Sequence, residues 1–132
     1  MENKAESSKR KMAERPVKGI HVFATLGSKT ARGGEVVTAS TGSEFNGHPI
    51  ARVGEMVRYP DGSESRIVSG AGFAAAVHRQ PIAIVGSATD NGDSIVSSLQ
   101  NALNIHEYSD EPIPGQLQPG YVYPETAPEQ AA

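Results

Sequence analysis

The residues of this chain best suited to metal binding or acid–base chemistry are its four histidines. They are His21, His48, His78 and His106. No two of them are four residues apart, the spacing that places a pair of imidazoles on one face of a helix. The chain has no cysteine, so thiolate metal sites and disulfides are excluded. We expect exposed or core histidines, with one alternative: a zinc site formed by these four residues if the fold brings them together.

Catalysis needs a nucleophile, a base and a group that orients the base. Serine, histidine and aspartate are all present, but the sequence has no Gly-x-Ser-x-Gly motif and no paired-carboxylate motif. The glycines at Gly33 and Gly34 are not followed by the Lys-Ser/Thr pair of a phosphate-binding loop. The acidic residues around Asp61 and Glu64 are typical of a solvated hairpin tip. The sequence therefore predicts a protein that is not an enzyme.

An internal repeat is the strongest indication of the fold. The pattern Pro-Ile-Ala-x-Val-Gly begins at Pro49 and again at Pro81, 32 residues later. Repetition in so short a chain predicts a fold built by stacking copies of one small unit. The repeat-motif residues are Pro49, Ala51, Arg52 and Gly54 in one copy and Pro81, Ala83 and Gly86 in the other. We expect both glycines to have backbone conformations that do not tolerate a side chain.

Short β-strands are predicted after three glycine-containing turns. The strands start at Val36, Ile67 and Ile95, with spacings of 31 and 28 residues. Asp-Gly precedes the second start and Asn-Gly the third, and both dipeptides are strong hairpin signals. The third unit ends after its first strand, so this pattern predicts two copies and a fraction of a third.

The chain divides into a β domain and two tails. Residues 1–17 are predicted to be a disordered, mostly basic N-terminal tail. Residues 18–105 form the β-repeat domain, which begins with a short strand over 19–24. Residues 106–132 are rich in proline and are predicted to be a flexible C-terminal tail, whose tyrosines could hold it to a surface.

Composition sets the class of protein. The 132 residues suffice for one domain. The chain has only 5% aromatic residues and no cysteine, so its core is thin and a bound partner is its expected support. The net charge of −3 gives no long-range attraction to nucleic acid or to a membrane surface. No apolar run is long enough for a membrane anchor, and the N-terminus lacks the apolar stretch of a signal peptide. We expect synthesis in the cytoplasm.

Three motifs resemble those of one family. Residues 26–34 read Leu-Gly-Ser-Lys-Thr-Ala-Arg-Gly-Gly, residues 49–52 read Pro-Ile-Ala-Arg, and residues 86–92 read Gly-Ser-Ala-Thr-Asp-Asn-Gly. These resemble, in order and at similar spacing, the opening motif, the Pro-Ala-Ala-Arg motif and the closing motif of the PAAR-repeat family. The resemblance covers residues 20 to about 100 and leaves out both tails.

The resemblance implies a fold and a role. Members of the family are small cones of short β-hairpins on the tip of the trimeric VgrG spike of the bacterial type VI secretion system. They sharpen the spike and can carry effectors. The expected fold is therefore all-β, a small cone with pseudo-three-fold repeats. The expected partner is a VgrG-like trimer that binds one copy, with the tails available to an effector or adaptor. The secretion apparatus would export the protein to the outside or into a target cell.

One departure from the family concerns its zinc ion, which histidine and cysteine side chains hold at the tip. The matching positions in this chain are Arg32, Tyr59, the stretch from Asp61 to Glu64, and Ser87 or Asn91. A tetrahedral zinc site needs thiolate or imidazole ligands, and arginine cannot be a ligand. We therefore predict no zinc and no other cofactor. Arg32 is expected instead to pair with Asp61, Asp90 or Asp93.

Two further non-enzymatic interpretations remain open. The first is the tip protein of a phage tail spike, which would do the same mechanical work with the same fold. The second is a generic β-repeat adaptor that recognises its partner through the C-terminal tail. Deletion of that tail distinguishes the second interpretation from the spike tip.

Overall fold

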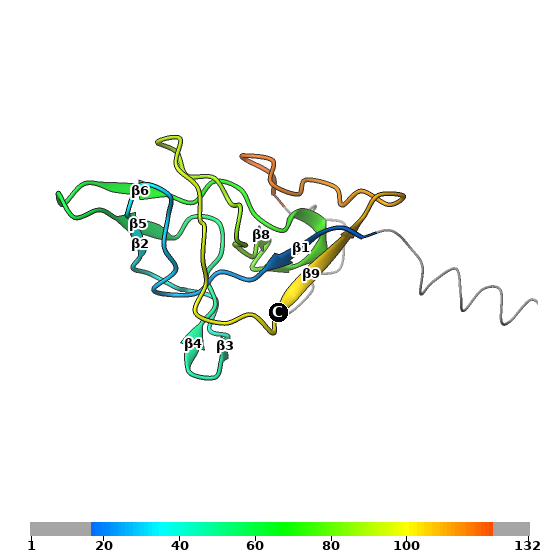
Figure 1. Ribbon diagram of the computed structural model, residues 1–132, viewed down its shortest axis with the longest axis horizontal. Coiled ribbons are helices and arrows are strands. Elements are labelled where there is room, and N and C mark those ends of the chain that lie inside the picture. The colour runs from blue at the N-terminus through cyan, green and yellow to red at the C-terminus, as the bar shows by residue number, and fades with distance from the viewer. Residues whose placement is uncertain (1–16, 123–132) are drawn as a thin grey trace, which may run out of the picture.

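The computed structural model describes residues 17–122, which form short β-strands and one short 3-10 helix (Figure 1). In chain order these are β1 (Val17–Val22), β2 (Glu35–Val36), β3 (Glu44–Phe45), β4 (His48–Pro49), β5 (Met56–Arg58), β6 (Glu64–Arg66), η1 (Gly72–Ala74), β7 (Ala76–Val77), β8 (Gln80–Pro81) and β9 (Asn104–Tyr108). The expected all-β class is confirmed, and the strand predicted over 19–24 is observed as β1, over 17–22. Of the predicted tails, 1–17 and 106–132, residues 1–16 and 123–132, including Tyr123, lie outside the described residues.

Three fully buried alanines form a triangle at the centre of the fold. The amide of Ala24 donates to the carbonyl of Ala83 (2.8 Å), that of Ala83 to Ala51 (3.0 Å), and that of Ala51 to Ala24 (3.0 Å). A closed ring of three such bonds requires three segments with the same conformation around one axis. The fold is therefore pseudo-three-fold, with units that begin at Val22, Pro49 and Pro81.

A second ring of backbone bonds joins the same three units, with donors and acceptors in the opposite order around the axis. Its donors and acceptors are Leu26 and Pro49 (2.9 Å), Val53 and Pro81 (2.9 Å), and Val85 and Val22 (2.8 Å). Within each unit, the amide of the motif glycine donates to the carbonyl at the predicted strand start. These pairs are Gly27 and Val36, Gly54 and Ile67, and Gly86 and Ile95, all at 2.8 Å. The repeated motif and the turn-plus-strand pattern are therefore two halves of one unit.

The prediction of two copies and a fraction was wrong, because the structure has three complete units. The missed copy is the first, which reads Val-Phe-Ala-Thr-Leu-Gly over 22–27 and lacks the Pro-Ile pair of the other two. Val22 can replace proline because its carbonyl accepts the same bond, from Val85, that the Pro81 carbonyl accepts from Val53. The strand start at Ile95 closes the third unit and does not open a further one.

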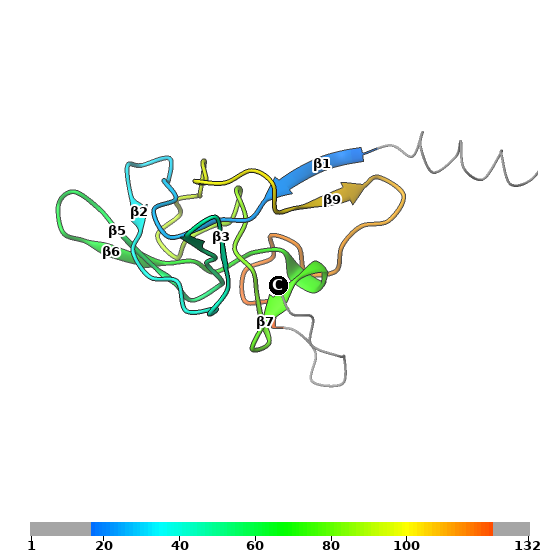
Figure 2. The same cartoon turned by 90° about the horizontal axis from the view of Figure 1, so that it is seen from below.

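Neighbouring units meet in two-stranded ribbons at the end that we call the wide end, so each unit contributes one strand to each of two ribbons. Two ribbons are local hairpins, β3–β4 and β7–β8, and the third is β1–β9. Their registers match, with Phe45 opposite His48, Val77 opposite Gln80, and Ile105 opposite His21. Figures 1 and 2 both show β1 beside β9. The ring of three units is thus closed by segments from the two ends of the described chain.

The predicted domain boundary at residue 105 does not hold for residues 106–122. Strand β9 runs to Tyr108, and the following segment binds the second unit through backbone bonds. Phe73 donates to Pro114 (2.8 Å), Leu117 to Gly70 (2.8 Å), and Gly120 to Val68 (3.0 Å). The prolines of this segment had indicated a flexible tail. Prolines are, however, tolerated where their missing N–H is not needed, as at a sheet edge.

The core consists of two clusters along the axis. One lies around the alanine triangle and includes Val36, Val57, Ile67 and Ile95; the other lies towards the wide end. The wide-end cluster includes the equivalent residues Phe23, Ile50 and Ile82. Burial of each isoleucine contributes about 1.5–3 kcal/mol, so repetition of one apolar position three times gives a small domain a continuous core.

Candidate functional site at the apex and wide end

Three of the predicted tip residues occupy equivalent positions at the end opposite the ribbons, which we call the apex. The amide of Ala31 donates to Ser94 (2.9 Å) and that of Asp90 to Arg66 (2.9 Å), while Arg58 pairs with Glu35. Ala31, Arg58 and Asp90 are therefore equivalent, and so are the residues that follow them, Arg32, Tyr59 and Asn91. The family resemblance named these residues as tip positions, with Asn91 as one of two alternatives, and the structure brings the three together.

The apex residues bind one another across unit boundaries. A guanidinium nitrogen of Arg32 (Nη1) donates to the carbonyl of Asn91 at 3.0 Å. The Tyr59 hydroxyl accepts from Nδ2 of Asn91 at 3.1 Å and donates to Oδ2 of Asp93 at 2.7 Å. Arg32 belongs to the first unit, Tyr59 to the second and the other two residues to the third. We call these four residues the apex network.

Asp93 is the centre of the apex network, although its side chain is only 4% exposed. Its Oδ1 accepts from the backbone amides of Arg32 (3.1 Å) and Ser94 (2.8 Å), and a Thr30 side-chain bond adds to that of Tyr59. Burial raises the pKa of Asp93, but these four hydrogen bonds together outweigh burial and hold the pKa below the ordinary value of 3.8. The carboxylate is therefore ionised at neutral pH.

The predicted pairing of Arg32 with an aspartate takes a different form. Arg32 does bind Asp93, but through its backbone amide, while its guanidinium binds the Asn91 carbonyl. Asp90 accepts from the Arg66 amide at 3.1 Å. Asp61 accepts from the amide and hydroxyl of Ser63, at 2.9 and 2.6 Å, which lowers its pKa. Neither Asp61 nor Asp90 therefore belongs to the apex network.

A longer turn separates Asp61 from the other tip residues. Tyr59 and Arg66 are seven positions apart, whereas their equivalents Arg32 and Glu35 are three apart. The additional four residues form the end of the β5–β6 hairpin, at one end of the molecule in Figure 1. Glu64 in this hairpin binds Arg58 at 3.0 Å.

Ser87, the alternative to Asn91, lies below the apex. It is fully buried and its hydroxyl accepts from the Ile84 amide at 2.9 Å. The equivalent Ser28 accepts from the Thr25 amide in the same way, at 2.9 Å. Both serines therefore have a structural role in the turn of their unit.

A glycine gives the Tyr59 ring its place at the apex. A Cβ built on Gly34 would lie 2.8 Å from Cε1 of Tyr59 and 2.6 Å from Cγ1 of Val57. Real Cβ atoms do not approach other atoms so closely, so only glycine fits here. Gly34 is equivalent to Asp93, because each amide donates to the threonine hydroxyl four residues earlier, at 2.8 and 3.0 Å.

The four histidines do not gather into one site. His21 lies 3.2 Å from Glu107, and His106 meets Tyr108 edge-on with ring centroids 6.3 Å apart. His48 is in β4, and His78 has φ 50° in the turn between β7 and β8. Within residues 17–122 no three His, Asp or Glu side chains are grouped so that they could hold a metal ion. The structure therefore does not support the alternative zinc site formed by all four histidines.

The apex does not fit the zinc ion that the resemblance implied. Its side chains at the matching positions are a guanidinium, a phenol and a carboxamide. A guanidinium has no lone pair to offer, and structural zinc takes thiolate and imidazole ligands.

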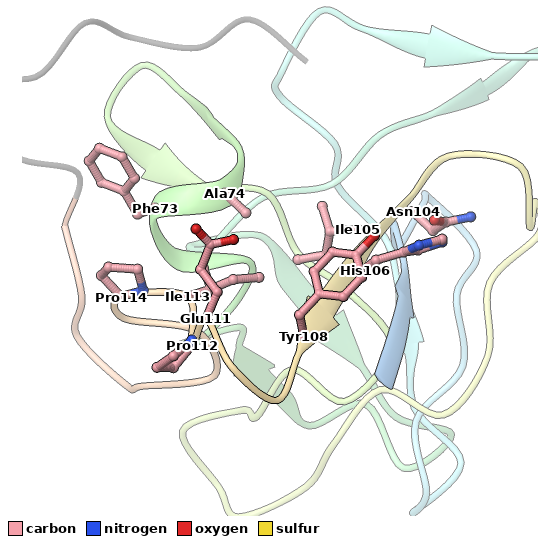
Figure 3. Close-up of a pocket in the computed structure, with 10 residues that line it drawn as sticks. All are labelled: Phe73, Ala74, Asn104, Ile105, His106, Tyr108, Glu111, Pro112, Ile113 and Pro114. Atoms are coloured by element: carbon pink, nitrogen blue, oxygen red, sulfur yellow. The ribbon is translucent and has the colours of Figure 1, made fainter. Parts of the chain in front are cut away.

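The wide end presents an apolar triad of equivalent residues, Phe45, Val77 and Ile105. Each is partly buried and packs against the wide-end cluster. Beside Ile105, an open hollow of about 600 Å³ lies between β9, η1 and the segment around Pro112. Figure 3 shows Phe73, Tyr108 and Glu111 around this hollow.

Comparison with known proteins agrees with this geometry. The PAAR motif family matches residues 26–97, which is more than half of the chain and includes the apex network and both Pro-Ile-Ala copies. No curated protein and no solved structure matches the chain. Among the described residues, no helix has the length and apolar character needed to cross a bilayer. The chain thus belongs to the PAAR motif family, and this motif implies a spike-tip protein of the type VI secretion system.

Proposed function

We propose that this protein caps a VgrG-type spike with its wide end against the trimer, one copy per trimer, and its apex pointing forward. The observation that carries the proposal is the apolar triad of Phe45, Val77 and Ile105, repeated around the pseudo-three-fold axis. One chain can match the end of a three-fold trimer only if it offers each subunit a similar surface. Three ribbons at equivalent positions meet this requirement.

Two kinds of contact support binding at the wide end. The three ribbons are two-stranded, so a further strand of the spike can pair with a ribbon edge by β-augmentation. Such pairing satisfies the backbone groups that a blunt β-structured end leaves open. Burial of the apolar triad adds hydrophobic stabilisation of about 25 cal/mol per Å². Backbone hydrogen bonds and apolar contacts would then both form at each of the three ribbons.

The function proposed for the cap is mechanical. The PAAR motif family is a family of non-catalytic spike tips, and we propose that this chain does no chemistry. A narrow apex concentrates the force of the spike on a small area, and backbone rings between units keep the cone rigid. We further propose that the apparatus carries the protein out of the cell, and that residues 1–16 or 123–132 can attach an effector or adaptor.

The test is the mass of a complex between the purified full-length chain and the VgrG-like trimer encoded nearest its gene. Size-exclusion chromatography with light scattering should give one chain per trimer. Phe45→Asp and Val77→Asp should each abolish the complex, because a carboxylate would be buried at the contact. Val96→Asp is the matched control, since Val96 is an apolar residue 52% exposed and outside the triad.

Two results would contradict the proposal: two or more chains per trimer, or a complex that survives both triad substitutions. Binding to a phage tail trimer with the same sensitivity would support the phage interpretation instead. The adaptor interpretation needs a recognition segment outside the fold. Residues 109–122 bind the second unit, so the deletion that tests it is 123–132, and loss of the partner would favour the adaptor.

A further inference from the structure

We propose that the apex of this cone is held together without metal, by a hydrogen-bond network in which the Asp93 carboxylate joins all three units. The proposal does not depend on the spike partner, because every contact that carries it lies within the chain.

The apex network connects each unit to the third one. From the first unit, the Arg32 amide reaches Oδ1 of Asp93 (3.1 Å), and the Arg32 guanidinium reaches the Asn91 carbonyl (3.0 Å). From the second unit, the Tyr59 hydroxyl reaches Oδ2 of Asp93 (2.7 Å). The two carboxylate oxygens thus bind different units, and loss of this one side chain would remove a hydrogen bond from each of them to the third unit.

The three units make different and complementary contributions at the position of Asp93. The first unit has Gly34, which leaves space for the Tyr59 ring. The second unit has Ser65, whose hydroxyl lies 3.3 Å from that of Tyr59. Only the third unit has a carboxylate here. A symmetric apex would bring three carboxylates together and would need a cation, whereas this asymmetric apex needs none.

The polar groups of the apex are satisfied by one another. Asp93 accepts from two backbone amides and two hydroxyls while 4% exposed. Across residues 17–122, every buried side-chain nitrogen and oxygen has a hydrogen-bond partner. A buried carboxylate bonded in this way costs little to keep ionised. The apex therefore has no set of unsatisfied ligand atoms that could bind a metal ion.

The first test is metal content and its effect on stability. We expect elemental analysis of the full-length protein, purified without chelator, to give well under one zinc per chain. We also expect the melting temperature to be unchanged by EDTA or by added zinc. Stoichiometric zinc, or a melting temperature that falls in EDTA, would overturn the proposal.

The second test asks whether the hydrogen bonds of the apex network stabilise the fold. Tyr59→Phe removes one hydroxyl and keeps the ring, and should lower the melting temperature by about 5 °C. Asp93→Asn should lower it further. The double variant should lose less than the sum of the single losses, because both remove the same bond. Asp61→Asn is the control, since Asp61 bonds only within its hairpin turn. Additive losses, or an unchanged melting temperature in Tyr59→Phe, would contradict the proposal.

Discussion

The hydroxyl of Tyr59 lies 2.7 Å from Oδ2 of Asp93, and this contact joins the second unit of the cone to the third at its apex. The two residues are 34 positions apart in the chain. A bond from a neutral hydroxyl to a buried carboxylate is charge-assisted and stronger than one between neutral groups. The apex is therefore stabilised by a polar contact, while the centre of the cone is stabilised by backbone rings and apolar packing.

This contact makes the stability of the apex dependent on pH, because it requires the ionised form of Asp93. The pKa of Asp93 in the folded state lies below its ordinary value of 3.8, so its ionisation stabilises the fold above that pH. The stabilisation is lost as the pH falls through the folded pKa. Arg32 and Tyr59 are the other titratable groups of the apex network. We expect the melting temperature of the wild type to fall steeply below about pH 4.

We call the fall in melting temperature below about pH 4 the acid limb. Asp93→Asn should flatten this limb, as measured by thermal melts from pH 7 to pH 2. Asp61→Asn is the control for a carboxylate whose pKa is also lowered. Because Asp61 is exposed, solvent screens its contribution and its substitution should change the limb much less. Equal flattening in the two variants would refute a special role for Asp93.

The close approach of Gly34 to Tyr59 predicts a steric cost. Gly34→Ala should destabilise the fold by about 1–3 kcal/mol, because the new Cβ would overlap the Tyr59 ring and Val57. Gly33→Ala is the control: its Cβ would meet nothing within 4 Å, but its φ of +86° brings a backbone cost of about 1 kcal/mol. Urea titrations give both values. If Tyr59→Ala does not relieve part of the Gly34→Ala cost, the ring is not its cause.

Sequence patterns predicted the repeat and the all-β class, since each depends on a local pattern. The family resemblance indicated Arg32, Tyr59 and Asn91 as tip positions, and their equivalence became visible only in the structure. The sequence patterns did not reveal the first copy at 22–27, because the alanine triangle needs only a small residue and three backbone bonds. The proline content favoured a flexible tail, so the sequence did not indicate that residues 109–122 bind the second unit through backbone hydrogen bonds. The sequence left Asp61, Asp90 and Asp93 as candidate partners of Arg32, because only the packed structure shows which of these carboxylates is buried.

The expectation that the motif glycines do not tolerate side chains is supported by their backbone. Gly54 and Gly86 have φ of +99° and +104°, a region that L-residues rarely adopt. Around Gly54 a new Cβ would meet nothing within 4 Å, so the whole cost comes from φ. Gly54→Ala and Gly54→Leu, neither of which is branched at Cβ, should therefore destabilise similarly, by about 1–2 kcal/mol. A cost in urea unfolding that rises strongly with side-chain size would show that space, not backbone conformation, is limiting.

Closure of the ring by β1 and β9 can be tested with a disulfide. Ile20 lies opposite His106 in this antiparallel pair, and both side chains are exposed, so replacing them costs little. Residues opposite each other in such a pair have Cα atoms about 4.5–5.5 Å apart, within the range of a disulfide. The natural chain has no cysteine, so the double variant Ile20→Cys, His106→Cys can form only this bond within one molecule.

We expect the oxidised double variant to gain about 4 kcal/mol over its reduced form, since the bond closes a loop of more than 80 residues in the unfolded chain. Thermal melts with and without reductant measure the gain, and each single cysteine variant is a control for substitution alone. If β1 and β9 pair as described, the disulfide should form within the monomer under mild oxidation. Dimers in place of the internal bond would mean that another contact closes the ring of three units.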